Sequence, residues 1–389
     1  MASRAPAKRF AASLALFYAA TFGLLGTHLP FFTVWLKAIG IDPGWIGIVS
    51  AVPSVTRFTA LPLVTGSAER HHALRLAMIL TAFATAIGLV IVGLQSAAVP
   101  LLIIYAVTCC CWTPLVPLTD AYALRGVARY GLDYGPLRLW GSAAFVVGAL
   151  ACGLLVDLIA ARHLIWIIVA MAALVAGSSL LLRPLDEGQG KPRVASGGSA
   201  LLRDPSFLGL IISAALIQGS HVAYYVFASI SWQAHGLSGL TIAGLWTLGV
   251  LAEIVVFAVS PRFTVPPYLL VVIGGLSAVV RWSITASEPP LFVLALVQLG
   301  HGLTFGLTQL GTMGQMVRQV PVQVMARAQG YYTACSGLLT CVVSIGCGAL
   351  YARYGEGLYY LMAAMGGVGA FLMWLTSARF HPHSAVSGG

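Results

Sequence analysis

The sequence predicts an all-α membrane protein with twelve transmembrane helices, and three observations carry this prediction. Hydrophobic residues make up 59% of the 389 residues and charged residues only 8%, whereas soluble domains contain about 45–50% and about 25%. Twelve apolar runs each reach the length of about 20 residues that a bilayer requires. When the N-terminus is placed in the cytoplasm, sixteen of the 21 Lys and Arg residues fall on the cytoplasmic side.

The composition also excludes several classes of protein. So few charges could not cover the surface of a soluble particle of this size. This excludes a cytosolic globular enzyme, a nucleic-acid-binding protein and a disordered scaffold. The seven cysteines lie in apolar runs without metal-ligand spacing, so we expect them to pack as small hydrophobic side chains. We expect no metal and no cofactor.

The spans follow one another with short joins that carry Gly, Pro or charge, such as Gly40–Gly44 and Ser287–Pro290. The spans must be helices, because lipid cannot satisfy an open backbone and the alternation typical of β-barrels is absent. The first run is too long for the apolar core of a cleaved signal peptide. In chain order, the runs cover 10–36, 44–66, 73–95, 98–123, 135–159, 163–183, 206–233, 239–262, 266–286, 290–316, 326–351 and 357–378.

The remaining cations support the same orientation. Lys37, Arg162 and Arg353 fall in outer loops, and Arg57 and Arg281 fall inside spans. An excess of Lys and Arg marks cytoplasmic loops. We therefore expect a multi-pass protein of the bacterial inner membrane with both termini in the cytoplasm, and the net charge of +10 follows from this topology.

The spans divide into two halves that resemble each other. Residues 184–205 form the one long polar insert and read as a flexible cytoplasmic linker between six-helix bundles at 1–183 and 206–389. Gly26-Thr27-His28 in the first half corresponds to Gly219-Ser220-His221 in the second. Two parallel repeats of six spans predict a binding site near the bilayer midplane, between the halves.

Several motifs resemble those of a known transporter family. They are Gly66–Arg75 after the second span, Leu29-Pro30-Phe31-Phe32, Arg138-Leu139-Trp140-Gly141-Ser142 and His301–Gly306. Over its whole length the chain resembles the major facilitator superfamily, within it the branch of phenylpropionate permeases and lactose-permease-like proton symporters. The resemblance implies a secondary transporter that works by alternating access.

Lactose permeases carry a carboxylate eighteen residues before an arginine, and the two meet at the sugar site. Asp120 and Arg138 have this spacing here. The same permeases carry an arginine and a histidine twenty residues apart, which Arg281 and His301 match. The resemblance therefore implies that these four residues bind substrate or couple it to protons.

Three positions depart from the lactose-permease pattern. Thr304 stands where those permeases have the proton-carrying glutamate one turn beyond the histidine, and Gln298 stands in place of a lysine. The carboxylate of the eighth span is shifted by about one turn, to Glu253. Proton coupling must therefore use other residues than in lactose permeases.

Ionised groups deep in a bilayer cost several kcal/mol and usually face the protein interior with a partner. The five candidates are Arg57, Asp120, Arg138, Glu253 and Arg281. Arginine keeps its proton in proteins, so three arginines and two acids leave a permanent charge of +1. This favours a small, monovalent organic carboxylate as substrate, with an aromatic acid as one form of it. For each group, a structural salt bridge within the bundle is the alternative.

For proton coupling, Glu253 is the first candidate and Asp120 the second, and His301 could tune Glu253. We expect Trp140 near the site because it follows Arg138 closely. Seven further residues could line a cavity between the helices, and packing inside the bundle is the alternative for each. They are His28, Phe31, Gln218, His221, Tyr224, Trp246 and Thr304.

Three further functions stay open at this stage. The first is a proton symporter for a neutral sugar or nucleoside, and the second is an efflux carrier of drugs or metabolites. The third is an intramembrane lipid-modifying enzyme, which would need clustered polar groups near one interface. We expect the partners to be a small-molecule substrate, protons and the lipid bilayer, with no nucleic acid, and we expect a monomer.

Overall fold

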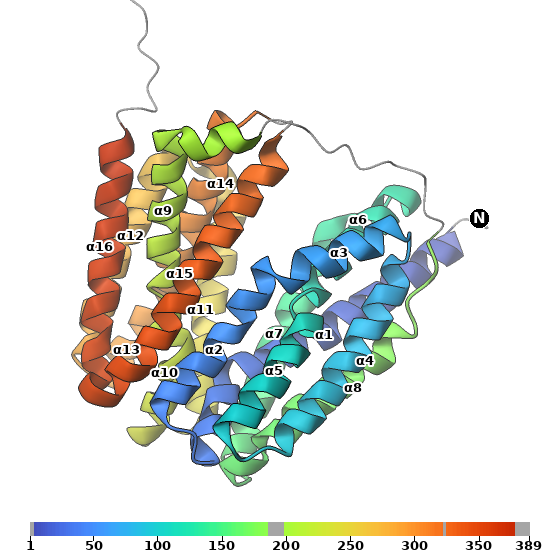
Figure 1. Ribbon diagram of the computed structural model, residues 1–389, viewed down its shortest axis with the longest axis horizontal. Coiled ribbons are helices and arrows are strands. Elements are labelled where there is room, and N and C mark those ends of the chain that lie inside the picture. Colours follow the sequence, from blue (N-terminus) through green and yellow to red (C-terminus); the bar gives the residue numbers. More distant parts are fainter. Residues whose placement is uncertain (1–3, 186–197, 322–323, 378–389) are drawn as a thin grey trace, which may run out of the picture. The chain divides into compact units, whose positions relative to one another are not determined.

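The computed structural model describes residues 4–185, 198–321 and 324–377. These ranges are almost entirely helical and contain no strand (Figure 1). Contacts divide the chain into two units, residues 1–190 with 225–247 and residues 191–224 with 248–389. The two expected bundles, 1–183 and 206–389, differ from these units chiefly in residues 225–247. Of the expected linker at 184–205, residues 186–197 lie outside the described ranges.

The first unit contains the helices of the first predicted half. They are α1 (Arg4–Ala38), α2 (Pro43–Phe58), α3 (Ala60–Arg70), α4 (Leu74–Gly93), α5 (Ala98–Trp112), α6 (Leu115–Tyr130), α7 (Tyr134–Val156) and α8 (Leu164–Ser179). The unit also takes most of α10 (Val222–Ala234) and the start of α11 (Gly239–Val259).

The second unit contains the remaining helices. They are α9 (Pro205–Gly219), the rest of α10 and α11, α12 (Pro267–Ala286), α13 (Leu291–Leu299), α14 (Thr308–Gln319), α15 (Met325–Tyr354) and α16 (Leu358–Ser377). A π-helical turn, Gly302–Leu307, joins α13 to α14. A 3₁₀ turn at Gly198–Arg203 precedes α9.

The helices confirm the predicted spans. In the described residues, 11 helical stretches are long and apolar enough to cross a membrane. The last of these, Arg327–Ser377, contains both α15 and α16. A turn at Gly355–Gly357 separates the two helices, and Gly355 has a φ of 52°, a conformation that favours glycine. Each of the twelve predicted runs therefore corresponds to a helical segment.

Four of the predicted spans are broken helices, which the apolar pattern alone did not indicate. The second span breaks between α2 and α3 at Thr59, and the fourth breaks between α5 and α6 at Thr113-Pro114. The seventh breaks between α9 and α10 at Ser220-His221, and the tenth changes to a π turn after His301. Such breaks release backbone groups that polar side chains can satisfy.

Aspartates mark the starts of three helices. The Asp42 carboxylate accepts a hydrogen bond from the Trp45 N–H (3.2 Å) at the start of α2, and Asp204 accepts one from Ser206 (2.8 Å) at the start of α9. Asp157, just after α7, accepts hydrogen bonds from the N–H groups of Gly239 (2.6 Å) and Leu240 (3.2 Å) at the start of α11. An acid stabilises a helix N-terminus because the N–H groups there lack partners.

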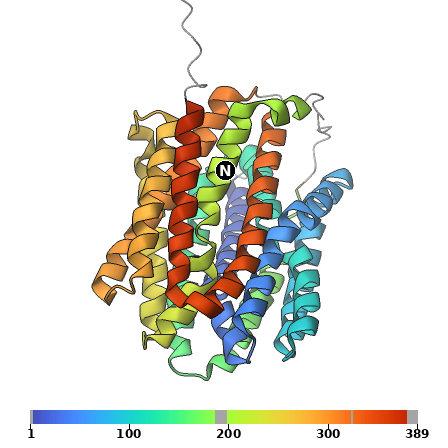
Figure 2. The same ribbon diagram turned by 60° about the vertical axis from the view of Figure 1, so that its left-hand side comes forward.

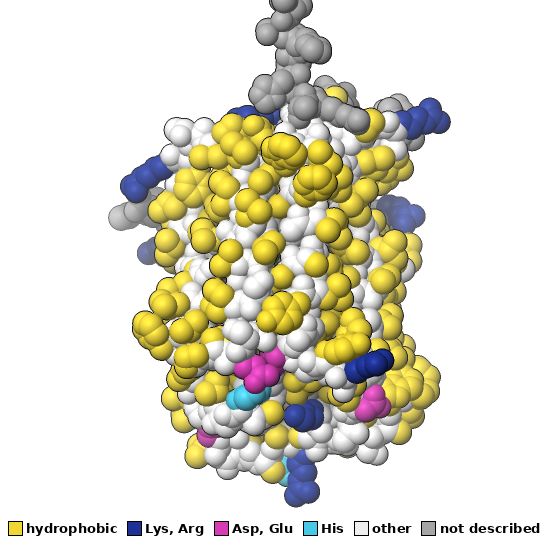
Figure 3. All heavy atoms as spheres, turned by 90° about the vertical axis from the view of Figure 1, so that its left-hand side faces the viewer, with side chains coloured by type: hydrophobic (Ala, Val, Ile, Leu, Met, Phe, Trp, Pro, Cys, Tyr) yellow, Lys and Arg dark blue, Asp and Glu magenta, His cyan; other side chains and the backbone are white. Residues whose placement is uncertain are grey.

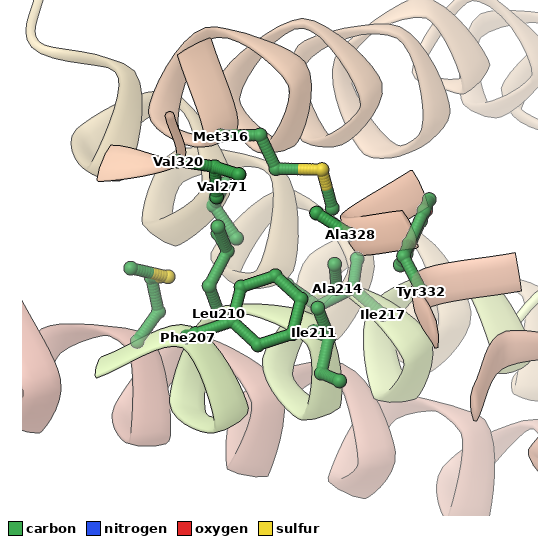
Figure 4. Close-up of a cluster of buried hydrophobic side chains, with 11 residues drawn as sticks. Phe207, Leu210, Ile211, Ala214, Ile217, Val271, Met316, Val320, Ala328 and Tyr332 are labelled. Atoms are coloured by element: carbon green, nitrogen blue, oxygen red, sulfur yellow. The ribbon is translucent and has the colours of Figure 1, made fainter. Parts of the chain in front are cut away.

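Hydrophobic packing holds the second unit together around α9. Phe207, Leu210, Ile211, Ala214 and Ile217 lie along one face of α9 and are buried. They pack against side chains of α12, α14, α15 and α16 (Figure 4). Helices α9, α12 and α16 lie side by side in both ribbon views (Figures 1 and 2).

Small residues allow some helices to approach closely. A Cβ atom added to Gly26 of α1 would lie 2.2 Å from the backbone oxygen of Phe145 in α7. Only glycine fits there, as in other membrane helix interfaces.

One face of the molecule is mostly apolar. Figure 3 shows this face covered mostly by hydrophobic side chains, with charged side chains towards its upper and lower ends. This pattern suits a helix bundle surrounded by lipid.

Candidate functional site

A cluster of polar side chains lies buried in the second unit, around Arg281 of α12. Its Nη1 donates hydrogen bonds to His301 Nδ1 and Thr304 Oγ1, both at 3.0 Å, and its Nη2 donates to Gln298 Oε1 at 3.0 Å. Arg281 is only 3% exposed, and the three acceptors are also buried. The cluster thus places neutral acceptors around both terminal nitrogens of a buried guanidinium.

The π turn places these acceptors on one side of the chain. It begins directly after His301 and contains Thr304 and Phe305. The rings of His301 and Phe305 stack at 5.4 Å with an interplanar angle of 16°. π-helical turns within α-helices are rare and often occur at functional sites. Here the wider turn brings His301 and Thr304 to the same nitrogen of Arg281.

The hydrogen-bond partners determine the tautomers of the two histidines. His221 Nδ1 lies 3.1 Å from the Ile217 carbonyl oxygen, which can only accept, so Nδ1 carries the proton. His221 Nε2 therefore accepts from the Thr304 hydroxyl at 2.9 Å. His301 Nδ1 accepts from Arg281, so in the neutral ring the proton lies on Nε2.

The proton on His301 Nε2 faces an acid. Glu253 Oε2 lies 3.7 Å from this nitrogen. The Glu253 side chain is 26% exposed, whereas that of His301 is 8% exposed. Glu253, His301 and Arg281 therefore form a chain in which the carboxylate is the most exposed member.

Aromatic side chains surround the same guanidinium. The Arg281 Cζ lies 4.3 Å from the Trp282 ring centroid and 5.0 Å from that of Tyr224. Trp282 donates from Nε1 to Ser220 Oγ at 2.9 Å, close to the break between α9 and α10. Gln218 on α9 donates to the Phe305 carbonyl oxygen at 3.4 Å. The structure thus brings Gln218, Tyr224 and Thr304, which the sequence suggested, to this cluster.

A second polar cluster lies in the first unit, around Asp120 of α6. Tyr18 of α1 donates its hydroxyl to Asp120 Oδ1 at 2.6 Å, and Tyr134 of α7 donates to the same oxygen at 3.0 Å. Arg138 lies one turn after Tyr134, and its Cζ sits 3.9 Å from the Phe22 ring centroid and 5.6 Å from that of Tyr18.

Asp120 and Arg138 share Tyr18 as a neighbour, but they do not form an ion pair within the described part of the chain. The pairing that the resemblance implied is thus replaced by two phenol hydroxyls on Asp120 and aromatic rings beside Arg138. Among the described residues, no hydrogen bond or ion pair satisfies the Arg138 guanidinium.

Arg57, near the end of α2, is exposed. Within the described ranges it forms neither a hydrogen bond nor an ion pair. Arg57 and Arg138 thus both lie inside membrane-spanning stretches of the first unit, and neither has an acidic partner among the described residues.

The other expected residues of the first unit take packing positions. His28 is buried among aromatic rings, stacks on Phe32 at 4.4 Å, and lies within hydrogen-bond distance of the Tyr105 hydroxyl at 3.2 Å. Phe31 is fully buried, and Trp246 donates to Ser229 Oγ at 2.9 Å.

Trp140 differs from these residues. It is 59% exposed and makes no ring contact with the described aromatic residues. Its position two residues after Arg138 turns it away, because successive helix positions point about 100° apart.

Comparison with known proteins identifies the family. Residues 11–362 match the family model described as MFS_1 like family. The chain belongs to this family. As a major facilitator superfamily transporter it is 34% identical over 378 residues to the "Probable 3-phenylpropionic acid transporter" of Escherichia coli (strain K12), with 92% of this chain and 96% of the relative covered.

The transporter is also 26% identical over 376 residues to the "Maltose permease" of Geobacillus stearothermophilus, covering 94% of this chain and 93% of the relative. A solved structure of the nucleoside transporter NupG matches with a TM-score of 0.84 at 16% identity, covering 94% and 99% of the two chains. A structure of a D-xylose-proton symporter matches with a TM-score of 0.71 at 14% identity, covering 97% and 98%.

These findings confirm the fold, and they identify a multi-pass carrier of small molecules rather than an enzyme. Sequence reasoning missed the tyrosines on Asp120, the Phe22 ring beside Arg138, and the role of Trp282. Tyr18 and Phe22 lie one turn apart on the first span, so their helical spacing was the one available signal. The π turn left no signal that we recognise.

Proposed function

We propose that this transporter carries a small organic carboxylate across the membrane by alternating access, coupled to protons. The observation that carries the proposal is Arg138, a cation in a membrane-spanning helix that no described acid neutralises. Arginine cannot lose its proton to escape the cost of burial. Its planar guanidinium pairs with a carboxylate through two parallel hydrogen bonds. A monovalent acid would thus neutralise the site as it binds.

The surroundings of Arg138 favour an acid with an aromatic ring. The rings of Phe22 and Tyr18 flank the guanidinium, and aromatic rings pack well against one another in offset or edge-to-face geometry. The relative named as a probable 3-phenylpropionic acid transporter is consistent with this chemistry. Arg57 is a second cation of the same unit that could attract the acid.

We assign proton binding to Glu253. His301 cannot accept a proton at Nδ1 without losing its hydrogen bond from Arg281. Its Nε2–H instead faces the partly exposed Glu253 carboxylate, so an incoming proton meets Glu253 first. Protonation would remove the negative charge beside His301 and so weaken the electrostatic support for the Arg281 cluster. The protonation of Glu253 on α11 would thus affect the buried hydrogen bonds between Arg281 of α12 and Thr304 of the π turn.

The proposed cellular setting follows from charge placement. We propose a monomer in the bacterial inner membrane with both termini in the cytoplasm, because cytoplasmic segments hold sixteen of the 21 cations. With the proton gradient directed inward, symport of the acid with protons would drive import, which is the direction that we propose.

The test is uptake by purified protein in proteoliposomes with an imposed pH gradient, acidic outside. We expect 3-phenylpropionate to accumulate and its amide, uridine and maltose not to. Arg138→Gln should abolish this uptake. Arg129→Gln is the matched control, because Arg129 also lies by a tyrosine ring but at the exposed end of α6. Accumulation of only the neutral solutes would overturn the proposal in favour of a sugar or nucleoside symporter.

A further inference from the structure

We propose that Tyr18 and Tyr134 determine the preference of the Arg138 site for anions, by keeping Asp120 from neutralising Arg138. This inference rests on the proposed function and names two positioning residues for it. Both hydroxyls donate their one proton to Asp120, so neither tyrosine is available to donate a hydrogen bond to the substrate.

The first step concerns what Asp120 would otherwise do. Opposite charges attract strongly away from bulk water, and Arg138 lies on α7 one turn beyond Tyr134, whose hydroxyl already reaches Asp120. Asp120 is therefore the acid best placed to pair with Arg138. Such a pair would neutralise the cation and compete with an incoming carboxylate at a high local concentration.

The second step concerns how the tyrosines prevent this pairing. Both phenol hydroxyls donate to one oxygen, Oδ1 of Asp120, at 2.6 and 3.0 Å. Hydrogen bonds to an ionised acceptor are roughly twice as strong as neutral ones. The donors come from α1 and α7, so the acid on α6 is held by two separate helices.

The third step concerns the rigidity of this arrangement. Tyr18 is fully buried, and it neighbours both charges: its hydroxyl contacts Asp120, and the Arg138 Cζ lies 5.6 Å from its ring centroid. Tyr134 is the first residue of α7, so its position is tied to that of Arg138 on the same helix. Both tyrosines that hold Asp120 are thus fixed in position close to Arg138.

The consequence is a site whose charge is set by hydroxyl groups. With the tyrosines present, Asp120 is satisfied without Arg138, and the guanidinium stays positive towards a ligand. Without the hydroxyls, Asp120 would turn to Arg138, and the site would become electrically neutral. A neutral site would favour uncharged solutes over acids.

The test measures the dissociation constants of 3-phenylpropionate and 3-phenylpropionamide for purified protein in detergent. In the double variant Tyr18→Phe/Tyr134→Phe, we expect the constant for the acid to rise about tenfold, the equivalent of about 1.4 kcal/mol, while that for the amide changes little. Adding Asp120→Asn to the double variant should restore binding of the acid, because no competing carboxylate is left.

Tyr122→Phe is the matched control. Its hydroxyl donates to the Arg183 carbonyl oxygen at 2.6 Å in the same unit, so its removal should leave the ratio of acid to amide affinity unchanged. A double variant that binds the acid like the wild type would overturn the inference, and so would a triple variant in which binding is not restored.

The two proposals fail in different ways. If Arg138→Gln removes binding of the acid but the tyrosine variants have no effect, only the role of Tyr18 and Tyr134 is wrong. If the wild type does not bind the acid, or if Arg138→Gln binds it normally, the proposed function is wrong and the inference falls with it.

Discussion

Replacing Thr304 by valine would test whether the buried cluster of the second unit is held by one hydroxyl. Valine has nearly the same shape, so packing at this fully buried position is retained. The hydroxyl accepts from Arg281 Nη1 at 3.0 Å and donates to His221 Nε2 at 2.9 Å. Without the hydroxyl, Arg281 loses one hydrogen bond, and His221 Nε2 stays buried without its donor.

The size of the effect follows from these two losses. A hydrogen bond to a charged group contributes about 1.5–3 kcal/mol, and a buried unsatisfied acceptor costs about 1–3 kcal/mol. Interhelical hydrogen bonds in membranes are weaker, about 0.6 kcal/mol on average. We therefore expect a destabilisation of about 2.5–3 kcal/mol, at the low end of the summed range. The corresponding fall in Tm is about 3 °C, because a chain of 389 residues has an unfolding entropy of about 0.8 kcal/mol/K.

Thermal unfolding of the purified protein, followed by tryptophan fluorescence, measures this change. Thr308→Val is the matched control, because the Thr308 hydroxyl is equally buried but donates only to the Thr304 carbonyl oxygen of its own helix, at 2.7 Å. Thr304→Ser keeps the hydroxyl and should lose less stability than Thr304→Val. Equal Tm values for Thr304→Val and Thr308→Val would refute the central place given to Thr304.

Three further predictions concern coupling and packing. Glu253→Gln should abolish accumulation driven by a pH gradient but retain exchange of labelled for unlabelled substrate, and undiminished accumulation would remove Glu253 from the coupling role. Asp157→Ala should lower the free energy of unfolding by about 1 kcal/mol. Asp133→Ala should not, because Asp133 makes no hydrogen bond to its helix. Equal free energies of unfolding for the two variants in chemical denaturation would contradict this prediction. Gly26→Ala should sharply reduce the yield of monodisperse protein, because the new Cβ would lie 2.2 Å from a backbone oxygen. Gly244→Ala is the control and should purify normally, because Gly244 has open space around it.

The helices could be predicted from the sequence because the bilayer imposes a length and a polarity on each of them. The breaks at Thr59 and at Ser220-His221 could not, because they depend on which polar groups satisfy the freed backbone. The π turn after His301 is likewise a local departure from helical spacing that leaves the hydrophobic pattern unchanged.

The charged residues of the site could be predicted individually, since an ion inside a span is rare. Arg281 and His301 do lie together, as the resemblance to lactose permeases implied. The partner of Asp120 could not be predicted, because Tyr18 is 102 positions away in the sequence. Only the packing of α1 against α6 and α7 brings the phenol to the carboxylate, and no local pattern encodes that contact.

The most direct test of the central claim is a structure of the transporter bound to 3-phenylpropionate, determined by cryo-electron microscopy. We predict that the ligand carboxylate lies within hydrogen-bond distance of the Arg138 guanidinium, with the phenyl ring near Phe22 and with Asp120 still held by Tyr18 and Tyr134. A ligand carboxylate bound elsewhere, with Arg138 paired to Asp120, would contradict the account.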